Sequence, residues 1–287
     1  MKILITGTNG FLGRKLFTSL KDKYEVYGTS RRMSCLQERI YLVDLLDEKE
    51  PEKIIEETSP DILINTASIV DVDKCEKNNK LAHKTHISLT EKLVRLCNNN
   101  KIKLIQFSSD YVFSGEEDGY LVSSKKRPIN YYGQTKSSGE DIILKSSNNS
   151  TIVRPTWLYG FNSLEDKNNF VLNVLNRLSQ DKEVILDNRR IKYPLLIDDV
   201  SKAVQEIIEF GYNGIFHISG KDETTKYSMG LKIAKMFGFQ ENLVIGKDLN
   251  EINRPYKIKF LDGWPKTTGL DEGLKLIKKQ MEEFKRK

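Results

Sequence analysis

Cysteine and histidine are scarce in this chain of 287 residues, which has three of each. The cysteines, Cys35, Cys75 and Cys97, are odd in number and widely spaced, and none of them forms a Cys-x-x-Cys pair. A disulfide framework normally shows an even set of cysteines, and a metal site needs clustered ligands. The sequence therefore predicts reduced thiols without a chemical role, and it does not suggest a catalytic metal.

Long apolar runs are missing as well. No window approaches 18 consecutive apolar residues, so the sequence predicts no membrane span and no membrane partner. The first segment, MKILITGTNGFLG, has one basic residue, and its apolar residues are interrupted by Thr, Asn and Gly. A secretory signal needs a longer unbroken apolar stretch. Together with the reduced thiols, these absences favour a cytoplasmic protein.

The charge is not dominated by one sign. There are 46 basic and 40 acidic residues, which gives a formal net charge of +6, and the two signs are mixed along the chain. Such mixing is typical of a solvated surface rather than a nucleic-acid face. We therefore expect no nucleic-acid partner, although a modest positive balance can help to attract a phosphorylated ligand. The sequence leaves a homodimer open.

What the chain does contain, in its first half, is a regular alternation of short apolar segments with amphipathic ones. The predicted strands are Lys2–Thr6, Tyr24–Thr29, Arg39–Asp44, Asp61–Asn65, Lys103–Ser108 and Thr151–Arg154, and the predicted helices are Phe11–Leu20, Glu48–Glu57, Leu81–Asn98 and Tyr132–Leu144. Strands that alternate with helices of this length predict a parallel sheet covered on both faces. The predicted fold class is therefore α/β, a Rossmann-type doubly wound parallel sheet.

The pattern loosens after about residue 155. Helical stretches there alternate with short strands such as Ile215–Ile218. We expect a dinucleotide-binding domain over residues 1–155 and a smaller, mainly C-terminal α/β substrate lobe over 156–287. Parts of 195–220 are expected to pack back onto the first domain.

A glycine-rich turn follows the first predicted strand. It runs from Gly7 to Gly13 as Gly-Thr-Asn-Gly-Phe-Leu-Gly, and a helix is predicted directly after it. Glycines in this context let the backbone approach a pyrophosphate, and the start of the helix then holds the phosphates. The expected cofactor-binding residues of the turn are Gly7, Asn9, Gly10, Phe11, Leu12 and Gly13. The GxxGxxG spacing resembles the extended short-chain dehydrogenase/reductases.

The end of the second predicted strand indicates which dinucleotide binds. An NAD site usually has an acidic residue there, whereas this chain has Ser30, Arg31 and Arg32. Two guanidinium groups can bind a 2′-phosphate, so the sequence favours NADPH, with NADH as the alternative. The family resemblance implies that Asp44 and Leu45 lie by the adenine. The stretch Thr66, Ala67 and Ser68 after the fourth strand is expected to border the ribose and phosphate.

Two later segments carry the candidate chemistry. Ser109 follows the fifth predicted strand, and Tyr132 and Lys136 are four residues apart, on one face of a predicted helix. A nearby ammonium can stabilise a phenolate and lower the tyrosine pKa, which makes the phenol a usable acid–base group. We expect Tyr132 to protonate a carbonyl oxygen as hydride reaches its carbon, Ser109 to hydrogen-bond that oxygen, and Lys136 also to hold the nicotinamide ribose.

Longer motifs narrow the family. The stretches Ser108–Phe113 and Asn130–Lys136, with Asp71–Glu76 and Arg154–Gly160, resemble the dTDP-4-dehydrorhamnose reductase family over nearly the whole chain. The resemblance implies reduction of the 4-keto group of a nucleotide-linked 6-deoxyhexose, in nucleotide-sugar and polysaccharide biosynthesis. It also implies that Asp110, Tyr111 and Trp157 line the sugar pocket.

Two positions and one segment depart from the family pattern. His86 stands where relatives usually have an Asn that helps to position the lysine, and Ser109 stands where they usually have Thr. The segment Lys192–Leu195 does not match the pocket-forming segment of the family closely. A role for His86 in proton transfer is a weaker interpretation, and the identity of the sugar and of its nucleotide stays open.

Two other functions share these motifs. A nucleotide-sugar epimerase that keeps its NAD(P) bound would use the same three residues. A dehydratase is disfavoured because Tyr111 occupies the position where an acidic base would be expected. The resemblance also extends to the regulatory β subunit of methionine adenosyltransferase, whose role is not catalytic.

Overall fold

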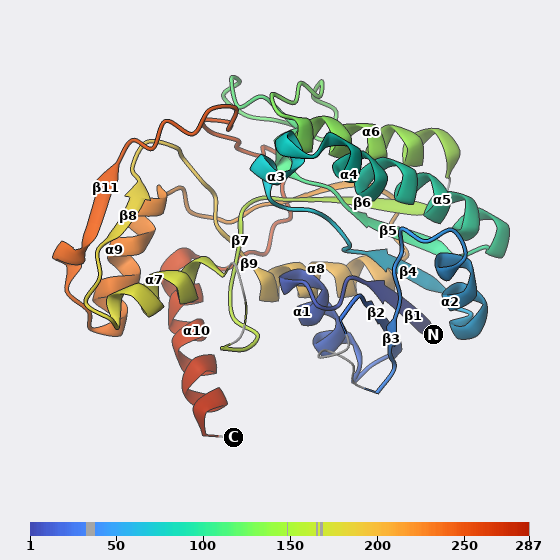
Figure 1. The fold of residues 1–287 in the computed structure, drawn as a ribbon, viewed down its shortest axis with the longest axis horizontal. Helices are drawn as coiled ribbons and strands as arrows, with labels where there is room; N and C mark the ends of the chain where they lie inside the picture. The colour runs from blue at the N-terminus through green and yellow to red at the C-terminus, as the bar shows by residue number, and fades with distance from the viewer. Residues whose placement is uncertain (33–37, 148, 165, 167–168, 287) are drawn as a thin grey trace. The chain divides into compact units, whose positions relative to one another are not determined.

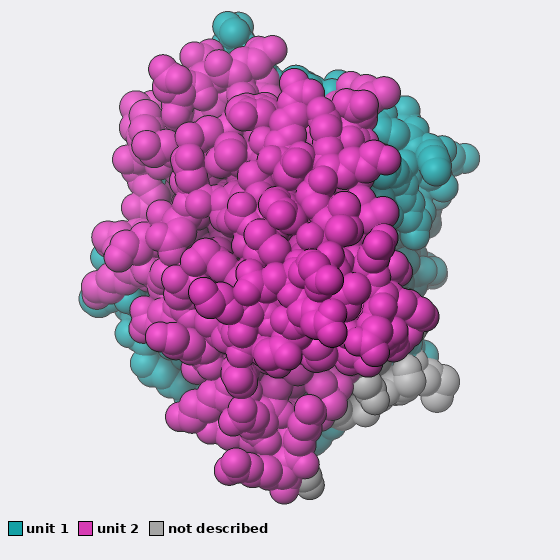
Figure 2. Space-filling view, turned by 90° about the vertical axis from the view of Figure 1, so that its left-hand side faces the viewer, with its two compact units in different colours: residues 1–113, 125–154, 203–216 teal, residues 114–124, 155–202, 217–287 magenta. Residues whose placement is uncertain are grey.

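The computed structural model describes residues 1–32, 38–147, 149–164, 166 and 169–286. The chain forms two compact units (Figures 1 and 2). Unit 1 consists of residues 1–113, 125–154 and 203–216, and unit 2 consists of residues 114–124, 155–202 and 217–287. Each unit is therefore built from separate stretches of the chain. Within the described residues, no helix combines the length and apolar character needed to cross a membrane.

Unit 1 is built around a seven-stranded sheet with the order β10-β6-β5-β4-β1-β2-β3. The strands are β1 (Lys2–Thr6), β2 (Glu25–Ser30), β3 (Ile40–Leu42), β4 (Ile62–Asn65), β5 (Lys103–Phe107), β6 (Ser150–Pro155) and β10 (Gly214–Ile218). Every neighbouring pair from β6 to β3 is parallel. The strand order reverses at β1, as in Rossmann-like sheets, so the predicted fold class is confirmed.

Helices cover both faces of this sheet. They are α1 (Phe11–Leu20), α2 (Glu50–Thr58), α5 (Leu89–Asn100), α6 (Tyr131–Ser146) and α8 (Ile197–Phe210). On one face, α2, α5 and α6 share a buried core with β1, β4 and β5 that includes Leu63, Leu93, Leu104 and Ile143. On the other face α8 meets α1, where Gln205 Nε2 donates to the Ser19 carbonyl at 3.3 Å (Figure 1). Apolar strands buried on both faces explain the nearly continuous hydrophobic runs of β1, β4 and β5.

The predicted helix Leu81–Asn98 is present but is not regular. The segment before β5 consists of α3 (Val72–Lys77), α4 (Asn79–His83), a π-helical turn η2 (Lys84–Ser88) and α5. The π turn lies beside α6: a Cβ added at Gly139 would be 2.9 Å from the His86 carbonyl oxygen. The sequence predicts the helix over Leu81–Asn98 but not the π turn within it. Apolar periodicity reports the buried face but not a one-residue bulge.

Unit 2 contains two small parallel sheets and several helices. The paired strands are β7 (Leu158–Tyr159) with β9 (Leu195–Leu196), and β8 (Val184–Asp187) with β11 (Val244–Lys247). The helices are α7 (Phe170–Leu178), the first residues of α8, α9 (Lys226–Phe237) and α10 (Leu270–Lys285), with a 3₁₀ turn, η4 (Glu241–Leu243). Their apolar faces form one core that includes Val174, Met229 and Leu274. This core gives the unit its own hydrophobic interior.

Candidate active site

The glycine turn leads from β1 directly into α1. Gly7 has a φ of +72°, a conformation that L side chains rarely adopt, and the Gly10 N–H donates to its carbonyl at 2.8 Å. A Cβ added at Gly13 would lie 2.4 Å from the Gly7 carbonyl oxygen and 2.7 Å from Thr66 Oγ1. The N-cap residue, Gly10, has no side chain to cap the helix, and no acidic residue lies in the first turn. The turn is therefore a tight backbone cradle at the positive end of a helix, which fits a pyrophosphate.

We expect Gly13→Ala to loosen this cradle. The added methyl group would collide with backbone as well as with Thr66, and overpacking of this kind costs about 1–3 kcal/mol. The free energy of unfolding should fall by that amount in a urea titration, and the NADPH dissociation constant should rise at least about tenfold. Gly263→Ala is the matched control, because the nearest atom to its Cβ would be 3.8 Å away. Equal behaviour of the two variants would contradict the cradle.

The expected adenine-side residues lie at the ends of β2 and β3. Arg31 and Arg32 are exposed, while Ser30 is buried, and its hydroxyl accepts the Arg32 N–H at 2.9 Å. Asn9 of the glycine turn donates to the same hydroxyl, which joins the turn to the end of β2. Asp44 accepts the Leu46 N–H at 3.1 Å, and Leu45 is buried. Both arginine side chains are thus open to solvent after β2.

A buried polar chain joins the carboxyl ends of β1, β4 and β5. The Thr6 hydroxyl donates to Asn65 Oδ1 at 2.6 Å, and Asn65 Nδ2 donates to Gln106 Oε1 at 2.9 Å. Gln106 Nε2 in turn donates to the Phe107 carbonyl at 3.1 Å. Thr66, the next residue after Asn65, bonds the Thr6 carbonyl at 2.6 Å, and the Ala67 N–H donates to Asn65 Oδ1 at 3.2 Å. These bonds fix the edge of the sheet on which the cofactor is expected. Sequence reasoning missed Thr6 and Gln106, whose signal is a polar residue at the end of an apolar strand.

Ser109, Tyr132 and Lys136 lie in unit 1, on two adjoining segments. Ser109 precedes the 3₁₀ turn η3 (Asp110–Val112) that follows β5, while Tyr132 and Lys136 lie in the first turns of α6. Asn130 caps α6 by accepting the Gly133 N–H at 2.7 Å. A Cβ at Gly133 would lie 2.1 Å from the Tyr111 carbonyl oxygen, so this glycine allows α6 to approach η3. The three side chains are buried, each less than a tenth exposed.

The Tyr132 phenol is in its neutral form at neutral pH. Burial raises its pKa above the ordinary value, and a hydrogen bond with Ser109 acts in the opposite direction. Lys136 Nζ donates to the Phe107 carbonyl at 3.0 Å and lies 5.9 Å from the centre of the Tyr132 ring. In this structure desolvation dominates over the ammonium charge.

Lys136 itself has a strongly shifted pKa. Burial lowers it to about 8, although Cys75 and Glu140 oppose that shift. Its ammonium therefore titrates near physiological pH. The same Phe107 carbonyl accepts from both Lys136 and Gln106, so the lysine is anchored to the polar chain described above.

The expected sugar-pocket residues fall in both units. Asp110 is buried beside Ser109, whose hydroxyl donates to it at 3.0 Å, and the Tyr111 ring packs edge-on against Tyr132 with 6.0 Å between the ring centres. Trp157 belongs to unit 2, where its ring packs edge-on against Phe170 at 4.8 Å. The sugar-pocket role of these three residues stays a prediction.

A buried ion pair, which the sequence analysis did not identify, joins α6 to β6. Glu140 is one helical turn after Lys136, and both of its carboxylate oxygens accept from Arg154 of β6, at 2.8 and 2.7 Å. Both side chains are almost completely buried. The sequence signal is an arginine inside an otherwise apolar strand, Thr-Ile-Val-Arg-Pro.

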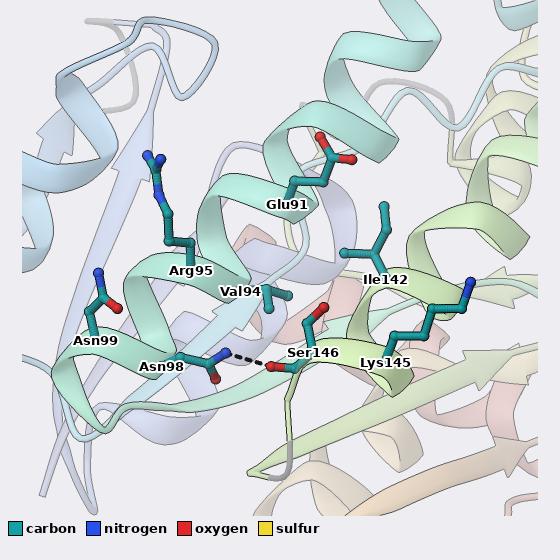
Figure 3. Close-up of a pocket in the computed structure, with 8 residues that line it drawn as sticks. All are labelled: Glu91, Val94, Arg95, Asn98, Asn99, Ile142, Lys145 and Ser146. Atoms are coloured by element: carbon teal, nitrogen blue, oxygen red, sulfur yellow. Dashed lines mark hydrogen bonds between the residues drawn. The ribbon is translucent and has the colours of Figure 1, made fainter.

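Cys75 and Cys97 are free and buried thiols, as the sequence predicts. Burial raises the pKa of Cys75 to about 11 and that of Cys97 to about 12, so both are protonated at neutral pH. Cys35 lies outside the described residues. A surface pocket is found elsewhere in unit 1, between α5 and α6, and the eight residues that line it include none of the expected site residues (Figure 3).

The parallel sheet, its glycine turn and the Ser, Tyr and Lys group after β5 define a Rossmann-like protein of the extended short-chain dehydrogenase/reductase type. A family model described as the RmlD substrate binding domain matches residues 1–257. Because this match covers most of the chain, the protein belongs to that family.

Individual relatives agree with this assignment. A probable low-salt glycan biosynthesis reductase, Agl14 of Haloferax volcanii, is 28% identical over 262 residues, which cover 89% of this chain and 86% of that protein. Methionine adenosyltransferase 2 subunit beta of Xenopus laevis is 29% identical, with coverages of 82% and 72%. The crystal structure of dTDP-4-dehydrorhamnose reductase from Bacillus anthracis in complex with NADP superposes with a TM-score of 0.87. It is 26% identical and covers 98% of this chain and 99% of that chain.

Proposed function

We propose that this protein is an NADPH-dependent reductase of the 4-keto group of a nucleotide-linked 6-deoxyhexose. The observation that carries the proposal is that Ser109, Tyr132 and Lys136 are all buried, on the segment after β5 and in the first turns of α6, at the end of the sheet to which the glycine turn also belongs. The names of two relatives, a glycan biosynthesis reductase and a dTDP-4-dehydrorhamnose reductase, support this reaction class. Its place in polysaccharide biosynthesis, a cytoplasmic location and a homodimer stay predictions.

The residues present fit a dinucleotide. The turn from Gly7 to Gly13 would hold the pyrophosphate through backbone N–H groups, and Arg31 and Arg32 would hold a 2′-phosphate. Thr66, Ala67 and Ser68 would border the ribose and phosphates, and Asp44 and Leu45 would lie by the adenine. When bound, the reduced nicotinamide supplies the hydride.

The side chains of the protein supply a proton and orient the carbonyl. Tyr132 is neutral because burial raises its pKa, so it can donate its phenolic proton to the substrate oxygen as negative charge develops there. Ser109 would donate a second hydrogen bond to the same oxygen. Lys136 would hold the ribose and place a positive charge near the phenolate that remains. Asp110, Tyr111 and Trp157 would bind the sugar.

The arginine pair predicts the choice of cofactor. In the double variant Arg31→Ala, Arg32→Ala, the dissociation constant for NADPH should rise at least about tenfold, because charge-assisted hydrogen bonds to the 2′-phosphate are lost. The dissociation constant for NADH, which has no such phosphate, should change less than about twofold. Titration by fluorescence measures both. Arg95→Ala, an exposed arginine on α5, is the control. Equal losses for the two cofactors would refute a 2′-phosphate site.

The lowered pKa of Lys136 predicts that activity falls on the alkaline side of the pH profile. Because this pKa is about 8, the ammonium loses its proton as the pH rises through that value. We expect kcat/KM, which reports the free enzyme, to fall above about pH 8. Arginine does not titrate in this range, so Lys136→Arg should remove the alkaline fall whatever activity it retains. An unchanged fall in that variant would assign the titration to another group.

The proposed function is tested by following NADPH oxidation with dTDP-, UDP- and GDP-linked 4-keto-6-deoxyhexoses. We expect consumption with one of these substrates. Interconversion of sugars without net NADPH consumption, by protein purified with bound dinucleotide, would favour the epimerase. The likeness to methionine adenosyltransferase 2 subunit beta makes a regulatory subunit the second candidate. No turnover with any sugar, together with co-purification with a synthetase, would support it instead.

A further inference from the structure

His86 has hydrogen-bond partners on both of its ring nitrogens. Nδ1 lies 2.8 Å from Thr135 Oγ1, on the helix that carries Tyr132 and Lys136. Nε2 lies 3.1 Å from the Ile69 backbone nitrogen and 3.0 Å from Ser68 Oγ, both in the chain that follows β4. The ring is 4% exposed and packs edge-on against Tyr132, with 5.6 Å between the ring centres. One side chain therefore bridges the two segments.

The partners of His86 determine which nitrogen carries the proton. The Thr135 hydroxyl donates its own hydrogen to the Tyr132 carbonyl at 2.9 Å, so it accepts from His86, and Nδ1 is the protonated nitrogen. The Ile69 amide can only donate, so Nε2 has no hydrogen and accepts. Burial and the charge of Lys136 lower the pKa of His86 to about 2, which agrees with a neutral ring.

The local backbone is shaped to allow this bridge. His86 lies inside the π turn η2, and the absence of a side chain at Gly139 lets α6 pass close to the His86 carbonyl. Thr90 donates to that carbonyl at 2.8 Å and so holds the turn through the backbone alone. Single π turns of this kind are frequent at functional sites.

We propose that His86, as a neutral imidazole protonated at Nδ1, is a positioning residue that couples the loop after β4 to the catalytic helix. The inference rests on the proposed function in one respect, because Ser68 borders the expected cofactor site and Tyr132 and Lys136 are its expected catalytic residues. His86 itself transfers no proton in this arrangement. It sets the distance between the segment that would hold the cofactor and the helix that would protonate the substrate.

The tautomer is tested without any substrate. Protein with ¹⁵N-labelled histidine rings gives one ring system for each of its three histidines, and His86→Asn identifies the one that belongs to His86. We expect Nδ1 of His86 to have the shift of a protonated nitrogen and Nε2 that of an unprotonated one at pH 7. A ring protonated at Nε2, or at both nitrogens, would overturn the proposal whether or not the reductase activity is found.

The coupling is tested with two variants that each keep half of the bridge. The Asn side chain places its amide near the position of Nδ1. His86→Asn therefore keeps the hydrogen bond to Thr135 and loses the contacts with Ser68 and Ile69 in the loop after β4. The Gln side chain reaches the position of Nε2. His86→Gln therefore keeps the contacts with the loop after β4 and loses the hydrogen bond to Thr135. His86→Asn should raise the NADPH dissociation constant about tenfold, whereas His86→Gln should leave it within about twofold and lower kcat about tenfold.

A third variant and a control separate coupling from stability. Thr135→Val should lower kcat about tenfold in the native background and have little further effect in His86→Gln, because both changes remove the same bond. Thr58→Val, which is equally buried and loses a bond to the Ile54 carbonyl within α2, should lower the melting temperature without changing NADPH binding. If all four variants lower NADPH binding in proportion to their loss of melting temperature, His86 is structural only. NADPH binding still decides the question if no keto sugar is reduced.

Discussion

Tyr132→Phe should lower kcat for keto-sugar reduction by about 10²–10⁴-fold, the range typical of losing a general acid. The variant removes one oxygen atom, and the phenyl ring still fills the space between His86 and Tyr111. Since burial keeps Tyr132 neutral, its proton is available at neutral pH without prior titration. The dissociation constant for NADPH should change less than about threefold, because the loss concerns the transition state rather than the bound cofactor.

The control for this measurement is the neighbouring tyrosine. Tyr131 is the first residue of α6, and Tyr131→Phe removes an equivalent hydroxyl from the same helix turn. We expect that variant to keep at least about half of the activity. Single-turnover measurements with premixed NADPH separate the chemical step from product release. Retention of full activity by Tyr132→Phe would remove Tyr132 from the mechanism, and loss in both variants would indicate damage to the helix rather than to the acid.

The second large effect concerns the buried ion pair between Glu140 of the catalytic helix, α6, and Arg154 of β6. Glu140→Gln should lower the free energy of unfolding by about 3–5 kcal/mol, because the Arg154 guanidinium would remain buried without its counter-charge. The geometry is favourable for such a loss, since both carboxylate oxygens accept from Arg154 and Lys126 lies 3.2 Å away. Urea denaturation measures this loss of unfolding free energy, and the m-value should stay unchanged.

Two further variants decide how this loss arises. The double variant Glu140→Leu, Arg154→Met replaces both charges with apolar groups and should recover most of the stability, as buried pairs often do. Glu209→Gln, which breaks the exposed pair of Lys23 and Glu209, should cost less than about 1 kcal/mol. If the double variant were as unstable as Glu140→Gln, the unpaired charge would not be the cause.

The ion pair also predicts how stability responds to acid. Burial raises the pKa of the Glu140 carboxyl, but Arg154 and Lys126 more than offset this and hold the pKa below its usual value. A carboxyl whose pKa is lower in the folded state stabilises the protein above its unfolded pKa, near 4.5. That contribution is lost as the pH falls through the folded value.

The features that could be predicted from the sequence are those that depend only on residues close together in the chain. The strand, glycine turn and helix around Gly7 to Gly13 are contiguous, and the backbone requirements of the turn leave few alternatives to glycine. The four-residue spacing of Tyr132 and Lys136 places both on one helix face whatever surrounds the helix. These residues could be singled out without knowing the packing.

The features that sequence missed depend on contacts between distant segments. The pairing of Glu140 with Arg154 exists only once α6 packs against β6. The π turn at His86 depends on the crossing of α6, which apolar periodicity does not report. The pKa of Tyr132 depends on how completely the site is buried, which the four-residue spacing of Tyr132 and Lys136 does not report.

The assembly of unit 1 from three stretches of chain has a consequence for its synthesis. Its sheet includes β10, and its helical cover includes residues 203–210 of α8, both of which follow residues 155–202 of unit 2 in the chain. A nascent chain that ends at residue 155 carries the glycine turn, Tyr132 and Lys136, yet lacks an edge strand and one covering helix. Unit 1 can therefore complete its fold only after residue 216 has left the ribosome, although domains often fold one after another during translation.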